Sequence, residues 1–141
     1  MKKILIVNSN YYKDISNNLV LRAKSTLKSI RCKVFIIEVQ GVHEIPVTIR
    51  KYIKKFDAFL ALGCVIKGQT PHFDLICSST FNAIMKLSIE YGKPIGNGIV
   101  TSFNLKQAKE RSKKKSNKKP NKGSEAAKAV ISMLNNEPKK I

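Results

Sequence analysis

Residues 61–77 read ALGCVIKGQTPHFDLIC, and this stretch decides the fold class. Its first half continues an apolar run from residue 59, which is typical of a strand buried on both faces of a parallel sheet. Residues 67–71 then form a polar turn, and from His72 onward apolar residues recur at three- and four-residue steps, which predicts a helix. The order of strand, turn and helix N-terminus predicts a ligand site, because ligands of open α/β sheets bind where strands end and helices begin.

Strands and helices are expected to alternate along the chain. The patterns predict strands at 3–8, 34–39, 57–64 and 94–101, and helices at 15–30, 45–54, 72–90, 104–112 and 123–135. This alternation predicts one α/β domain over residues 1–141, in which helices cover both faces of a four-stranded parallel sheet. Asp14 or Ser16 is expected to cap the first helix. Gly96 and Gly98 lie within the last expected strand, where glycine often marks close approach of another backbone or a ligand.

Composition excludes several classes of protein. The chain has 141 residues and 43% hydrophobic content, which suffice for one substantial core. No apolar segment has membrane-spanning length, and no secretory signal pattern opens the sequence, so a cytoplasmic location is expected. Cys32, Cys64 and Cys77 are odd in number and scattered, which favours reduced thiols over a disulfide framework.

The formal net charge of +18 leaves two interpretations open. It is compatible with a nucleic-acid partner, an anionic membrane or anionic substrates. It is equally compatible with a lysine-rich composition that decorates any solvated surface, because lysines are spread along the whole chain. A non-enzymatic nucleic-acid-binding α/β protein is therefore the alternative hypothesis. Against it, the most basic stretch, 113–122, lacks the aromatic residues on which bases stack.

Four separate segments are expected to meet at the carboxyl edge of the sheet, because right-handed crossovers place parallel strand ends together. They are Tyr11, the turn around Glu44, the segment 64–72 and Asn97. His72 is a candidate proton carrier there, since imidazole titrates near neutral pH. A purely structural role for His72 at the start of its helix is the competing interpretation. A zinc site is not expected, because the only histidines are His43 and His72 and no paired Cys/His spacing occurs.

Four motifs in order resemble the lumazine synthase family. Residues 39–46, VQGVHEIP, are similar to its V-P-G-A-F/W-E-I/L-P segment, and residues 63–74, GCVIKGQTPHFD, to its G-x-V-I-R-G-E-T-x-H-F/Y-D segment. Residues 94–101, PIGNGIVT, resemble the family's P-x-x-x-G-[IV]-[LV]-T strand, and residues 121–127 its N-K-G-x-E-A-A helix start. The resemblance covers nearly the whole chain.

The resemblance implies a flavodoxin-like three-layer sandwich and the penultimate step of riboflavin biosynthesis. That step condenses 5-amino-6-(D-ribitylamino)uracil with 3,4-dihydroxy-2-butanone 4-phosphate, without a metal or redox cofactor. It also implies pentamers with active sites between neighbouring subunits, and riboflavin synthase as a candidate partner. We expect a pentamer rather than an icosahedral 60-mer, because the lengthened, lysine-rich stretch 113–122 would crowd like charges around a symmetry axis.

The resemblance also implies roles for individual positions. His72 matches the family's proton-transferring histidine. Gln69 and Thr70 match the phosphate-binding turn, and Arg111 the arginine that pairs with the phosphate from the adjacent subunit. The pyrimidine and its ribityl chain are expected to contact eight positions: Tyr11, Val42, His43, Glu44, Cys64, Val65, Ile66 and Asn97. His43 replaces the family's Phe or Trp, and Gln69 replaces an acidic residue.

Overall fold

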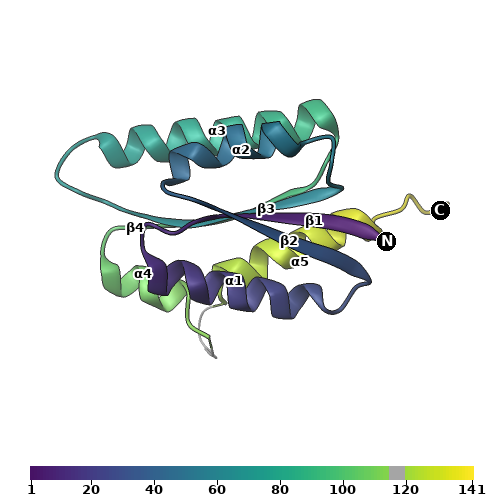
Figure 1. Cartoon of the computed structure of the whole chain (residues 1–141), viewed down its shortest axis with the longest axis horizontal. Helices are drawn as coiled ribbons and strands as arrows, with labels where there is room; N and C mark the ends of the chain where they lie inside the picture. The colour runs from purple at the N-terminus through teal and green to yellow at the C-terminus, as the bar shows by residue number, and fades with distance from the viewer. Residues whose placement is uncertain (115–119) are drawn as a thin grey trace.

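A four-stranded parallel sheet with the strand order β2-β1-β3-β4 forms the centre of the computed structural model, which describes residues 1–114 and 120–141. The strands are β1 (Lys2–Ser9), β2 (Cys32–Val39), β3 (Ala58–Ile66) and β4 (Ile95–Ser102). The helices are α1 (Lys13–Leu27), the short 3-10 helix η1 (Val42–Glu44), α2 (Ile45–Tyr52), α3 (His72–Tyr91), α4 (Leu105–Arg111) and α5 (Lys122–Asn135). Helices α2 and α3 cover one face of the sheet, and α1, α4 and α5 cover the other (Figure 1). The expected three-layer α/β sandwich is thus confirmed.

Strand β3 joins the two halves of the core, because its side chains alternate between the two faces. Leu60, Leu62 and Cys64 pack with residues of α1 and α5, whereas Phe59 and Ala61 pack with residues of α2 and α3. Every residue of β3 from Ala58 to Cys64 is buried, as expected of an inner strand in a doubly covered parallel sheet.

Strand β4 lies so close to α5 that side chains are excluded from two of its positions. A Cβ atom on Gly96 would collide with the backbone carbonyl of Ala126, and one on Gly98 would collide with the Leu62 side chain and lie 3.1 Å from the Ala126 Cβ. The expectation of close approach at these glycines is confirmed. At Gly96 the neighbouring group is the backbone of α5, whereas at Gly98 the nearest group is the Leu62 side chain of β3.

Some element boundaries differ from those expected. The first helix begins at Lys13 and ends at Leu27, and no side chain caps it. Neither Asp14 nor Ser16 is the cap, because Tyr12 occupies that position and the Ser16 hydroxyl donates to the Lys13 carbonyl oxygen. The third strand extends to Ile66, two residues beyond the expected end, so its last residues reach the carboxyl edge in extended conformation.

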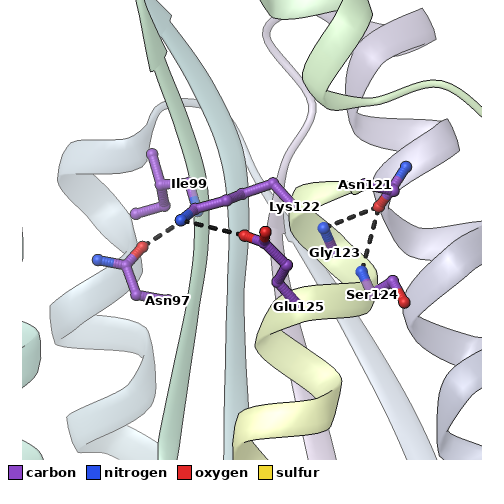
Figure 2. A network of polar contacts seen from close by, with 7 residues as sticks. All are labelled: Asn97, Ile99, Asn121, Lys122, Gly123, Ser124 and Glu125. Carbon is purple, nitrogen blue, oxygen red and sulfur yellow. Dashed lines mark hydrogen bonds and ion pairs between the residues drawn. The ribbon is translucent and has the colours of Figure 1, made fainter. Parts of the chain in front are cut away.

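Helix α5 is fixed at its start by Asn121, whose side chain is 2% exposed. Its Oδ1 accepts hydrogen bonds from the backbone of Gly123 (2.8 Å) and Ser124 (3.1 Å), which satisfies two free helix amides (Figure 2). Its Nδ2 donates to the carbonyl oxygens of Lys113 (3.1 Å) and Asn18 (3.5 Å). Asn121 therefore holds α5 against α1 and against the start of the basic stretch 113–122, of which residues 115–119 lie outside the described residues.

Candidate functional site

A cavity of about 480 Å³ opens at the carboxyl ends of β1 and β3. Its volume falls in the usual range for small-molecule sites, roughly 300–1,000 Å³. Seven of the site residues expected from sequence line it: Tyr11, Val42, His43, Cys64, Val65, Ile66 and His72. Tyr12, Gly41 and Ile76 complete the wall. Segments that are far apart in the sequence therefore meet at one end of the sheet.

Gly63 allows η1 to reach this cavity. A Cβ atom at Gly63 would lie 2.9 Å from both the Ser9 Cβ and the Val42 Cγ1, closer than side chains tolerate. Without that atom, η1 packs onto the end of β3, where Val42 is buried and His43 is exposed in the cavity wall. Glu44, the last residue of η1, is exposed outside the cavity lining, on the side of Gly41.

His72 is the first residue of α3 and is exposed. Its backbone N–H lies 3.5 Å from the Thr70 hydroxyl. Gln69 and Thr70 lie in the exposed turn that precedes the helix, so this 20-residue helix presents free amides and its positive end beside both side chains. The start of the turn is tied to the end of β4, because the Lys67 N–H donates to the Ser102 carbonyl oxygen (2.9 Å).

The inner wall of the cavity is uncharged at neutral pH. Burial raises the pKa of the Cys64 thiol to about 12, so the nucleophilic thiolate is scarce there. Burial, with smaller contributions from Cys64 and Tyr11, also raises the pKa of Tyr12. A neutral, largely apolar wall suits an uncharged aromatic ring better than a charged ligand.

Arg111 and Asn97 lie elsewhere in this chain. Arg111 lines a separate cavity of about 380 Å³ that also contacts Phe73 and Phe103, and a smaller one of about 140 Å³ that includes Lys122. Asn97 is the third residue of β4, opposite Ala61, and its Oδ1 accepts from the backbone of Ile99 (3.0 Å; Figure 2). Within one chain, the structure does not bring these two residues to the cavity that His72 lines.

Sequence reasoning missed three lining residues, each of which had a recognisable signal. Tyr12 follows the expected Tyr11 directly, and Ile76 lies one helical turn after His72, on the same face of the helix. Gly41 belongs to the 39–46 motif. Within residues 1–114 and 120–141, no group of three or more His, Cys, Asp or Glu side chains could hold a metal ion. In that same part of the chain, no helix is both long and apolar enough to span a membrane.

The parallel sheet, the neutral cavity at its carboxyl edge and the imidazole beside a helix N-terminus define the chain as an α/β enzyme of small-molecule metabolism. The family model of 6,7-dimethyl-8-ribityllumazine synthase matches residues 1–137. The chain belongs to this family, whose members are transferase-type enzymes of riboflavin biosynthesis, and the resemblance noted from the sequence is confirmed.

Individual relatives agree with the family model. The chain is 41% identical to the 6,7-dimethyl-8-ribityllumazine synthase of Buchnera aphidicola subsp. Acyrthosiphon pisum, over 94% of this chain and 84% of the relative. It is 38% identical to that of Zymomonas mobilis over 99% of both chains, and 37% identical to that of Corynebacterium kroppenstedtii over 92% of this chain and 80% of the relative. The function they support is lumazine synthase rather than nucleic-acid binding.

Proposed function

We propose that this chain condenses 5-amino-6-(D-ribitylamino)uracil with 3,4-dihydroxy-2-butanone 4-phosphate at the cavity that Tyr11 and His72 line, releasing phosphate and water. The observation that carries this assignment is the convergence of seven expected site residues on one cavity in a member of the family. An amine and a ketone react slowly unaided, so holding them in register supplies much of the acceleration.

The pyrimidine is proposed to lie between the Tyr11 ring and the end of β3. Tyr11 is 71% exposed, so its ring face is available for stacking. Val42, Cys64, Val65 and Ile66 provide the neutral wall on the other side. His43 and Glu44, at the cavity margin, are placed to bind the polar ribityl chain.

The phosphate is proposed to lie at the N-terminus of α3. Gln69, Thr70 and the free helix amides donate hydrogen bonds to an anion at such a position. His72, on the same first turn, then transfers protons between the reacting groups, a contribution of roughly 10²- to 10⁴-fold.

Arg111 and Asn97 are proposed to complete the site of a neighbouring copy. Neither residue lines the cavity of His72 in its own chain, so we propose that a second chain presents β4 and α4 to this cavity. Phe103, which lines the same cavity as Arg111, and Leu105, the first residue of α4, are 66% and 46% exposed, and contact with another copy would cover their apolar surface. A repeated contact between two different surfaces closes a ring, and we propose a pentamer.

The ring is proposed to remain a pentamer rather than to form a 60-subunit shell. Lys113 and Lys114 are exposed, and the sequence adds Lys115, Lys118 and Lys119, which lie outside the described residues. Like charges brought together by symmetry repel within about 8–10 Å at ordinary salt. Analytical ultracentrifugation over a series of salt concentrations tests this proposal, and a particle of sixty subunits would contradict it.

A cytoplasmic location and delivery of the product to riboflavin synthase are also proposed. All three cysteines are unpaired, Cys64 buried and the other two partly buried, as is usual in a reducing compartment. Fractionation of cells that express a tagged chain tests the location, and recovery of the chain in a membrane or secreted fraction would contradict it. A pull-down with purified riboflavin synthase tests the partnership.

The decisive experiment mixes the purified protein with the two substrates and follows lumazine fluorescence. Product formation no faster than the uncatalysed reaction would overturn the assignment. His72→Ala is expected to lower kcat while leaving both KM values nearly unchanged, with residual turnover from orientation alone. Arg111→Ala is expected to raise the KM of the butanone phosphate, because it removes a charge-assisted pair.

A further inference from the structure

Tyr11 has little of its own chain to hold it in place. Its side chain is 71% exposed, and its ring meets that of Tyr12 edge to face, with centroids 5.0 Å apart and planes at 74°. An exposed tyrosine samples several rotamers, and fixing one of them on binding costs conformational entropy. A ring that stacks on a substrate therefore benefits from a neighbour that restricts it beforehand.

Tyr12 is fixed by both its backbone and its ring. It occupies the N-cap position of α1, where its carbonyl oxygen accepts from the Ser16 N–H (2.9 Å). Its half-buried ring packs against the core on the α1 side of the sheet and lines the same cavity as Tyr11. The Tyr12 ring thus connects the start of α1 to the exposed ring of Tyr11, which is called the platform below.

We propose that Tyr12 is a positioning residue for binding of the pyrimidine substrate: its anchored ring sets the orientation of the Tyr11 ring and closes the cavity wall beside Cys64. The inference rests on the proposed function, because it assumes that the pyrimidine stacks on Tyr11. An edge-to-face pair is worth roughly a 2- to 10-fold change in an equilibrium constant beyond simple burial. Loss of the pair should therefore weaken pyrimidine binding by about that factor.

The kinetic test compares Tyr12→Leu with Tyr12→Phe. Tyr12→Leu is expected to raise the KM of the pyrimidine about 2- to 10-fold, leaving kcat and the KM of the butanone phosphate unchanged. Tyr12→Phe keeps the ring and should restore the wild-type KM. Tyr91→Leu is the matched control. Tyr91 is also half-buried, but it lies at the C-terminal end of α3, whereas the N-terminal end of that helix meets the cavity. Equal effects of Tyr12→Leu on both substrates, or none on either, would overturn the proposal.

A double-mutant cycle isolates the coupling between the two rings. In a Tyr11→Ala background, Tyr12→Leu should add almost nothing, since the platform that it positions is gone. If the two effects multiplied as independent ones, Tyr12 would act separately from Tyr11 and the proposal would fail. Absence of product from the wild-type protein, by contrast, would remove the proposed function itself.

A spectroscopic readout does not depend on catalysis. The chain contains no tryptophan, so Tyr11→Trp introduces a single indole, which is excited at longer wavelength than the tyrosines. Time-resolved anisotropy should show a larger fast local motion of this indole when Tyr12→Leu is added, and no change with Tyr12→Phe. Urea unfolding of each variant identifies any that fails to fold. If Tyr12→Leu fails to fold, Tyr12→Met, which also removes the ring but keeps a long apolar side chain, replaces it in the comparison. Identical local motion with and without the Tyr12 ring would refute the idea.

Discussion

Complementation between two inactive variants tests whether neighbouring copies share the site. Each proposed site has two halves, one at the start of α3 in one copy and one on α4 of its neighbour, and each is called a half-site. His72→Ala disables the first half-site, and Arg111→Ala disables the second. Because Arg111 does not line the cavity that contains His72, we expect the two groups of one site to come from two different copies. Oligomers assembled from both variants should therefore regain activity.

The size of the recovery follows from the geometry. In a closed ring built from a repeated contact, each site takes His72 from one copy and Arg111 from the next. With equal amounts of the two variants and random assembly, about one site in four receives both intact groups. The separate variants should retain about 0.01–1% of kcat for His72→Ala and about 1–10% of kcat/KM for Arg111→Ala, since a charged hydrogen bond is worth about 1.5–3 kcal/mol.

The assay uses co-expression of the two variants with different affinity tags, sequential purification and lumazine fluorescence at limiting butanone phosphate. About a quarter of wild-type activity is expected, well above the mean of the separate variants. The matched control pairs His72→Ala with Gln69→Ala, which disable the same half-site, and this pair should show far less recovery. Activity of the first pair no higher than the mean of the separate variants would refute the shared site.

Three further predictions concern the scaffold. Gly96→Ala should lower the free energy of unfolding in urea by about 3 kcal/mol, because its Cβ collides with the Ala126 carbonyl. Gly68→Ala should leave the free energy of unfolding nearly unchanged, because no atom lies within 4 Å of the added Cβ. Equal losses of stability in the two variants would contradict the packing argument. Burial raises the pKa of Cys64 from 9.0 to about 12. The protonated thiol therefore contributes fully to stability below pH 9, and this contribution is lost as the pH rises through 12. The free energy of unfolding should fall more steeply between pH 9 and 12 in the wild-type protein than in Cys64→Ala. Asn121→Ala should cost about 2 kcal/mol, whereas Asn121→Asp, which keeps the cap acceptor but not the amide donor, should cost less; the reverse order in thermal unfolding would show that the bonds from Nδ2 dominate.

The fold could be predicted because its determinants are local and repeated. The apolar run before Gly63 and the helical spacing after His72 fix a strand and a helix in order, and a parallel sheet with right-handed crossovers then follows. The boundaries of helices and strands were harder to predict, because the residue at which an element ends depends on tertiary contacts. The first helix starts at Lys13 without a side-chain cap, so the usual preference for Asp14 or Ser16 did not decide its start.

The sequence predicted the part of the candidate site that lies within one chain. Residues at the ends of β1 and β3 and on η1 must meet, because the strands lie side by side and Gly63 admits η1. Sequence order also placed Asn97 on the same edge, but Asn97 is the third residue of β4, far from the carboxyl end of that strand. The alternation of side chains is the same along a whole strand, so the sequence pattern does not show how far a residue lies from the end. Tyr12 was missed because its importance depends on ring geometry rather than on sequence spacing.

The positive net charge of the chain is compatible with a phosphate substrate. The cavity wall around Cys64 is neutral, so the high net charge does not come from the residues proposed to hold the pyrimidine. Cations instead occur at the β4 and α4 end, where Lys122 and Arg111 share a small cavity. In the proposed ring, this end of one copy faces the phosphate turn of the next. The separation of a neutral half-site from a basic half-site therefore matches the two substrates, one an uncharged ring and the other a phosphate ester, and gives a physical reason for placing the halves on different copies.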